Sequence, residues 1–102
     1  MNPDDPRFLL RVAAAWPLPG LGLLALPEGP TPYLAACGLH TALAVVVRLP
    51  DGTCQPGFAT VEEVSRPDDD VPTRGLLLDV AGLRELPRGT TIGLAGPGPM
   101  PA

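Results

Sequence analysis

The feature that most constrains this chain is the placement of its prolines. Fifteen of the 102 residues are proline, about three times the ordinary usage of roughly 5%. These prolines separate short apolar runs. Because proline has no backbone N–H and breaks helices, it is confined mainly to turns and to the edges of sheets. The pattern therefore predicts short β-strands joined by turns.

Length and composition indicate one small domain. A chain of 102 residues, 45% of them hydrophobic, can build a single core. We expect a single domain over residues 8–96. The polar or Pro-rich ends, 1–7 and 97–102, are expected to be disordered tails.

The charge distribution argues against nucleic acid as a partner. The net charge is −4 and all seven cationic residues are arginines, which are scattered along the sequence. A nucleic-acid binder gathers its cations on one face. The chain has only four aromatic side chains, which is few for a protein that binds nucleic acid by stacking on its bases.

Alternating apolar residues locate the strands in the first half of the chain. Phe8–Trp16 has a period of two, although its alanine run also suits a helix. Pro17 and Pro19 are expected to end this segment. Leu43–Leu49 also alternates, and its consecutive valines disfavour a helix. The preceding Tyr33–Thr41 segment is left open among strand, helical turn and irregular structure.

The second half predicts further strands and a short helical turn. Gly57–Val64 has no cleanly apolar face, which favours a bulge within it. In Gly75–Val80, Leu76 and Leu78 share one face and Leu77 occupies the other. The remaining expected elements are strands at Leu21–Leu26 and Thr90–Ala95, hairpin turns at Pro19–Gly20 and Pro50–Gly52, and one helical turn at Gly82–Glu85. The chain is thus predicted to be all-β, a small six- to seven-stranded antiparallel β-barrel.

The order of these parts resembles the second domain of translational GTPases of the elongation factor Tu type. The motifs that carry the resemblance are LPGLG (18–22), TVEEVSRP (60–67), GLLL (75–78) and ELPRG (85–89). In that family the domain is a β-barrel that helps to hold the aminoacylated end of tRNA. The resemblance implies ligand-binding roles for Glu63 and Leu77. The chain has no GxxxxGK[ST] phosphate-binding loop, so we expect no GTPase domain and no GTP binding.

Other chemistry is poorly represented. Cys37, His40 and Cys54 are too few and too irregularly spaced for a zinc site. Asp68–Asp70 is interpreted as a solvated acidic loop. The chain has a single histidine and no serine-centred motif, so a catalytic triad is not expected. We therefore expect no enzyme activity, no metal and no cofactor.

The location predicted from sequence is the cytoplasm. The N-terminus is acidic where a signal peptide would be basic, and no apolar run is long enough to span a membrane. Cys37 and Cys54 are accordingly expected to be reduced thiols.

The functional prediction depends on which residues face outward. If Leu76 and Leu78 face the core, Leu77 faces outward, and together with Val46 and Val61 it would form an apolar interaction patch. The sequence thus predicts a non-enzymatic module that binds a protein partner or forms a homodimer. The alternative, implied by the resemblance, is a module that binds RNA or an aminoacyl-type ligand.

Overall fold

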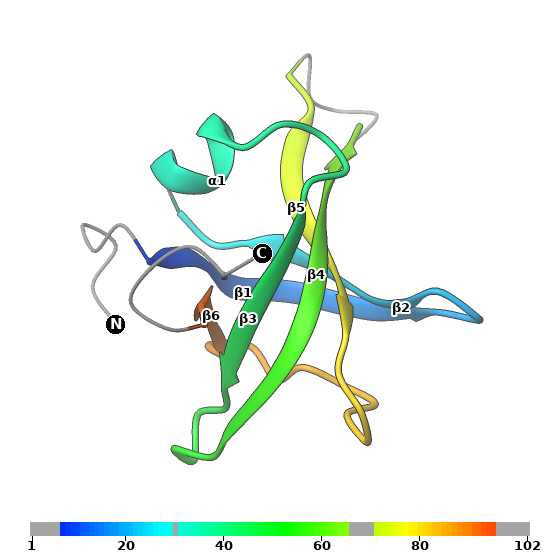
Figure 1. Ribbon diagram of the computed structural model, residues 1–102, viewed down its shortest axis with the longest axis vertical. Coiled ribbons are helices and arrows are strands. Elements are labelled where there is room, and N and C mark those ends of the chain that lie inside the picture. Colours follow the sequence, from blue (N-terminus) through cyan, green and yellow to red (C-terminus); the bar gives the residue numbers. More distant parts are fainter. Residues whose placement is uncertain (1–6, 30, 66–70, 96–102) are drawn as a thin grey trace.

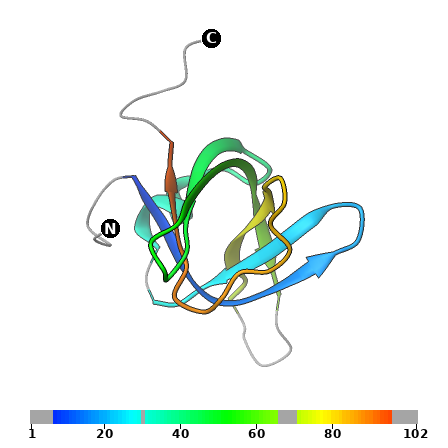
Figure 2. The same cartoon turned by 90° about the horizontal axis from the view of Figure 1, so that it is seen from below.

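The computed structural model describes residues 7–29, 31–65 and 71–95, and shows a closed antiparallel barrel (Figure 1). Its elements are β1 (Phe8–Leu18), β2 (Gly22–Pro27), α1 (Pro32–Ala36), β3 (Ala42–Arg48), β4 (Cys54–Val64), β5 (Thr73–Asp79) and β6 (Thr91–Leu94). The order around the barrel is β1-β2-β5-β4-β3-β6. Seen from below, the strands form a ring (Figure 2). The all-β prediction is confirmed with six strands. The predicted tails, 1–7 and 97–102, lie outside the described residues apart from Arg7.

Strand β1 is longer than predicted and changes the face that it buries. Its pairing with β2 shifts register between Val12 and Ala14. Val12 is buried, whereas Ala14 and Trp16 are exposed, so the prediction that all three share a buried face is wrong. A bulge inserts one extra residue and reverses the alternation beyond it.

Pro17 lies inside β1, where the sequence predicted the strand to end. The carbonyl of Leu18 accepts a hydrogen bond from the Leu21 N–H at 2.9 Å, so the backbone groups of Leu18 point toward β2. By alternation those of Pro17 point away from β2, where no ladder hydrogen bond is required. The strand therefore continues through the proline.

The β1–β2 hairpin turns at the predicted Pro19–Gly20 and projects from the body of the barrel (Figures 1 and 2). Gly20 has a φ of 79°, as the third residue of a type II turn requires. Gly22 then passes very close to β5: a Cβ on Gly22 would lie 2.1 Å from the carbonyl oxygen of Leu78. Only glycine fits at this crossing.

The β3–β4 hairpin forms at the predicted Pro50–Gly52 turn. Gly52 N–H donates to the Leu49 carbonyl at 2.9 Å, and the Asp51 carboxylate accepts from the Thr53 N–H at 2.8 Å. Strand β4 begins at Cys54, earlier than expected, and pairs with β3 and β5 in unbroken register. The bulge favoured for Gly57–Val64 is therefore absent from this strand.

The segment left open in the sequence is a short helix followed by a turn. Helix α1 packs against β1 and β5, and its Leu34 is completely buried. After Cys37 the chain turns through His40, whose φ of 65° is the one positive value among the described non-glycine residues. The His40 N–H donates to the Val61 carbonyl at 2.7 Å, which fixes the loop onto the end of β4.

The helical turn predicted at Gly82–Glu85 is wrong. The Leu83 N–H donates to the Val80 carbonyl at 3.2 Å, which makes a single tight turn. Gly82 has a φ of 78°, a left-handed conformation that a right-handed helix cannot include. Leu83 and Leu86 then pack against the core, and residues 83–87 form no regular secondary structure.

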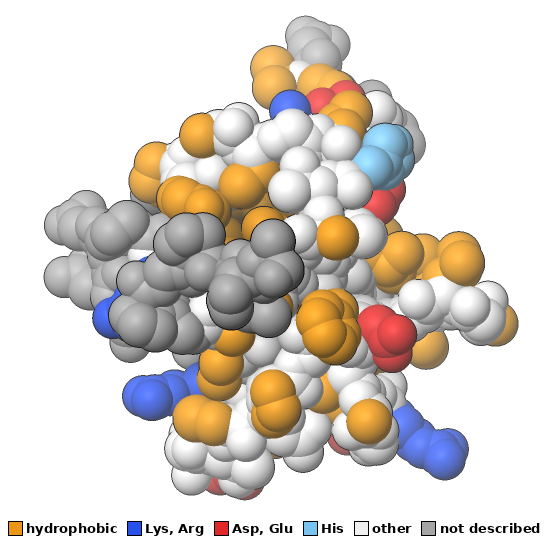
Figure 3. Space-filling view, in the orientation of Figure 1, with side chains coloured by type: hydrophobic (Ala, Val, Ile, Leu, Met, Phe, Trp, Pro, Cys, Tyr) orange, Lys and Arg blue, Asp and Glu red, His pale blue; other side chains and the backbone are white. Residues whose placement is uncertain are grey.

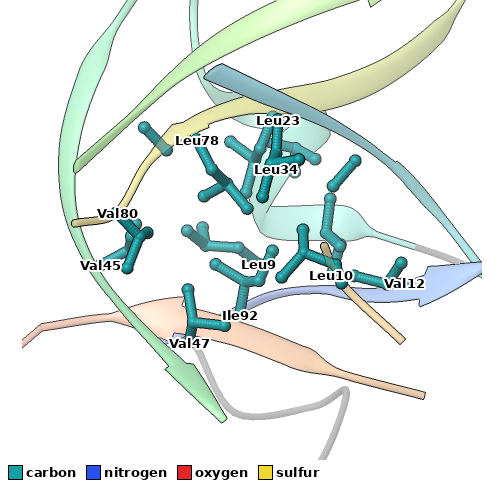
Figure 4. Close-up of a cluster of buried hydrophobic side chains, with 14 of the residues drawn as sticks. Leu9, Leu10, Val12, Leu23, Leu34, Val45, Val47, Leu78, Val80 and Ile92 are labelled. Atoms are coloured by element: carbon teal, nitrogen blue, oxygen red, sulfur yellow. The ribbon is translucent and has the colours of Figure 1, made fainter. Parts of the chain in front are cut away.

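The core is filled by aliphatic side chains from every strand and from α1. Ten of these side chains are labelled in Figure 4, where they converge on the barrel interior. They include Leu9, Leu34, Val47, Leu78 and Ile92, each at most 1% exposed. The inward-facing residues of the strands therefore form the core. A binding surface must be formed by outward-facing residues or by residues at the ends of the barrel.

Candidate interaction surface on the outer face of the barrel

Strand β5 presents its two leucine faces as the sequence predicted. Leu76 and Leu78 are 0% and 1% exposed, whereas Leu77 is half-buried and faces outward. Strand pairing aligns Leu77 with Leu24 of β2 on one side and with Thr60 of β4 on the other. The same row continues to Trp16 on β1 and Ala42 on β3. Leu77 thus occupies the middle of a mainly apolar outer row.

A groove of about 240 Å³ opens beside this row; we call it the outer groove. It is lined by Leu21, Ala42, Phe58, Ala59, Thr60, Leu77 and Asp79. Phe58 and Leu21 are 63% and 64% exposed. Phe58 is outward because its neighbour Ala59 is buried, and Leu21 is carried to the groove by the tip of the β1–β2 hairpin.

Some of the exposed apolar residues are grouped: Leu21 and Phe58 line the outer groove and Trp16 lies on β1 of the hairpin, whereas Tyr33, Leu39 and Val71 lie elsewhere. Hydrophobic side chains gather on the projecting hairpin and on the strands beside it (Figure 3). Single exposed leucines are ordinary, but a contiguous apolar patch on a small protein usually marks an interaction site. Among the described residues, no arginine lines the outer groove.

The predicted patch of Val46, Val61 and Leu77 is only partly right. Val61 is 0% exposed and belongs to the core, because the unbroken β4 register places it inward with Ala59. Val46 does face outward and is half-buried. It lies four residues along β3 from Ala42, about 13 Å at the usual rise per residue, and does not line the outer groove.

Glu63 and Leu77 do not share a surface. In the β4–β5 ladder Glu63 is opposite Arg74, whereas Leu77 is opposite Thr60. Glu63 is three positions along β4 from Thr60, an odd offset, so their side chains leave opposite faces of the sheet. Glu63 instead pairs with Arg74 at 3.8 Å, and the Arg74 guanidinium donates to the Cys37 carbonyl at 3.2 Å. These contacts join β4 and β5 to the loop after α1.

Asp79 lies on the face of Leu77, and so does Glu62, which sequence reasoning did not single out. Its carboxylate accepts a hydrogen bond from the Thr60 hydroxyl at 2.9 Å and lies 3.3 Å from His40 Nδ1. Phe58 was also missed as a site residue. The sequence did contain a sign of this arrangement, because Ala59 and Val61 are apolar residues at alternate positions. If these two face inward, then Phe58, Thr60 and Glu62 face outward.

A second hollow, of about 470 Å³, opens at the end of the barrel near the hairpin; we call it the end hollow. It is lined by Pro17, Leu18, Gly20, Gly22, Leu23, Leu78, Asp79, Val80, Leu83 and Arg84. Asp79 lines both hollows. The hairpin tip also contributes to both, through Leu21 to the outer groove and Gly22 to the end hollow.

The cysteines and histidine do not form a site in the described part of the chain. Cys37 and Cys54 are both free thiols, and no group of three or more His, Cys, Asp or Glu residues there could hold a metal ion. Burial raises the pKa of the Cys37 thiol, an effect that the nearby Arg74 charge opposes. Asp68–Asp70 lies outside the described residues.

The described helix, α1, is far too short to cross a bilayer, and none of the described chain forms a helix that could do so. Comparison of the chain with protein-family models, with curated proteins and with solved structures gave no match.

Proposed function

We propose that this chain is a non-enzymatic β-barrel module that binds a protein partner through the outer groove. The observation that carries the proposal is the pair of exposed side chains, Phe58 and Leu21, which flank the half-buried Leu77. Covering them would remove apolar area from water, which is the main favourable term in protein association. Aromatic side chains at the centre of such a surface commonly carry much of the binding energy.

We further propose that the barrel is of the translation-factor second-domain type. The support is the order of the motifs around the barrel. The Pro19–Gly20 turn joins β1 to β2, the GLLL sequence (75–78) lies within β5, and the Pro87–Gly89 turn precedes β6. The RNA or aminoacyl-ligand alternative has less support, because Glu63 and Leu77 lie on opposite faces and no described arginine lines the groove.

The proposal can be tested by photocrosslinking. Phe58 would be replaced by p-benzoylphenylalanine in the full chain, expressed in its native cells and irradiated. A discrete protein adduct is expected, and its mass will identify another protein or a second copy. The matched control carries the same photoreactive residue at Val46, which is on the outer face but outside the groove.

The adduct should disappear when Leu77→Glu is added and should persist when Val46→Glu is added. Thermal unfolding of each variant would establish that the barrel remains folded. Equal labelling from positions 58 and 46, or an adduct unaffected by Leu77→Glu, would refute the outer groove as the interaction site.

A further inference from the structure

We propose that the outer groove and the end hollow together bind one extended segment of a partner protein, in which a lysine or arginine lies between two apolar side chains. This inference rests on the proposed function and specifies the chemistry of the partner. It follows from the one residue that lines both hollows, whose position we call their junction, and from its charge.

The two hollows lie beside the hairpin tip and have Asp79 in common. Each supplies apolar contacts: Leu21, Phe58 and Leu77 in the outer groove, and Pro17, Leu18 and Leu83 in the end hollow. Gly22 lines the end hollow, and Leu77 of the outer groove lies beside it: a Cβ on Gly22 would be 3.8 Å from Leu77 Cδ1. A segment that passes over Asp79 could therefore place one apolar side chain in each hollow.

Asp79 is the charged group at the junction. It is exposed at the end of β5 and is the one acidic residue that lines both hollows. Among the described residues its carboxylate has no ion pair and no side-chain hydrogen bond. A partner that covered this carboxylate without neutralising it would leave a desolvated, unpaired charge, which is strongly unfavourable.

Charge complementarity therefore selects a basic side chain opposite Asp79. The ammonium or guanidinium group can donate hydrogen bonds to the free carboxylate oxygens. Arg84 lines the end hollow but not the outer groove. Its positive charge would repel a second cation inside the end hollow, which confines the basic side chain of the partner to the junction. The net charge of −4 also favours a basic partner.

The test is a selection from a phage-displayed random peptide library on the wild-type chain, with depletion on folded Leu77→Glu protein. Enriched peptides are expected to share a Lys or Arg between two apolar residues. Enriched apolar peptides without a basic residue would refute this inference and leave the proposed function intact. If no peptide prefers the wild type over Leu77→Glu, the proposed function fails and this inference fails with it.

A double-mutant cycle assigns the charge contact to Asp79. Replacing the basic residue of an enriched peptide by Gln should weaken binding to the wild type about threefold to tenfold. The same peptide change should have no effect on Asp79→Asn protein. The control is Glu28→Gln, which removes one negative charge just after the end of β2 that is distant from Gly22. On this variant, replacing the basic residue of the peptide by Gln should weaken binding as much as it does on the wild type. An undiminished difference on Asp79→Asn protein would overturn the assignment.

Discussion

The adjacent residues Leu77 and Leu78 provide a direct test of the two faces of β5, because the same substitution should have very different effects at the two positions. Leu78 is 1% exposed and packs in the core. Leu78→Ala removes three carbon atoms, which costs about 2.4 kcal/mol at roughly 0.8 kcal/mol per buried methylene. The cavity left behind raises the total to as much as about 5 kcal/mol when the site cannot collapse.

Leu77 is half-buried on the outer face, so Leu77→Ala should reduce the free energy of unfolding by about 1 kcal/mol or less. Urea unfolding, followed by the fluorescence of Trp16, measures both variants. With a slope of roughly 1.5 kcal/mol per molar urea, a loss of 3 kcal/mol lowers the midpoint by about 2 M. The stability of a small domain is about 5–15 kcal/mol, so this loss is large.

Equal midpoint shifts for the two variants, or a larger shift for Leu77→Ala, would refute the assignment of faces. The same result would invalidate Leu77→Glu as a probe of the outer groove, since a charge at a buried position unfolds the chain. Unchanged slopes are needed for the comparison, because a change in slope signals an altered denatured state.

Three further outcomes are expected. Gly22→Ala should destabilise the barrel by about 2 kcal/mol or more. The new methyl group would meet the Leu78 carbonyl oxygen at 2.1 Å, and Gly22 has a φ of 132° that alanine rarely adopts. A thermal midpoint equal to that of the wild type would contradict the close crossing. Both cysteines should alkylate in the folded protein. Cys37 should react more slowly than the exposed Cys54, because burial shields the Cys37 thiol and raises its pKa. Mass spectrometry at timed intervals measures the two rates, and equal rates would contradict the burial of Cys37. The hydrogen bond from Thr53 lowers the pKa of Asp51 below 3.8, so its stabilising contribution is present above that pH and is lost as the pH falls through the lower folded-state value; carboxyl chemical shifts recorded against pH would show a midpoint of 3.8 or higher if this bond is absent in solution.

The sequence by itself determined the strands and most of their turns. Proline and glycine restrict the backbone locally, so the Pro19–Gly20 and Pro50–Gly52 turns follow from residues that need no distant partner. The alternation in Gly75–Val80 is equally local, and it correctly placed Leu78 inward and Leu77 outward. The all-β class and a count of six to seven strands could therefore be predicted from short windows of the chain.

Tertiary structure decided the features that depend on contacts between distant segments. The bulge after Val12 is set by pairing of β1 with two different strands, so local alternation wrongly grouped Trp16 with Val12. The face of Val61 was ambiguous until β3 and β5 fixed the register of β4 from both sides. Leu83 to Glu85 suit a helix by local propensity, but the turn at Gly82 and core packing by Leu83 and Leu86 leave the segment irregular.

The outer groove was beyond sequence reasoning for the same cause. Leu21, Phe58 and Leu77 come from three segments that meet only because the barrel closes with β2 beside β5 and β5 beside β4. Sequence alternation can state that a side chain faces outward. Which outward side chains become neighbours depends on strand order, and strand order is a property of the closed barrel as a whole.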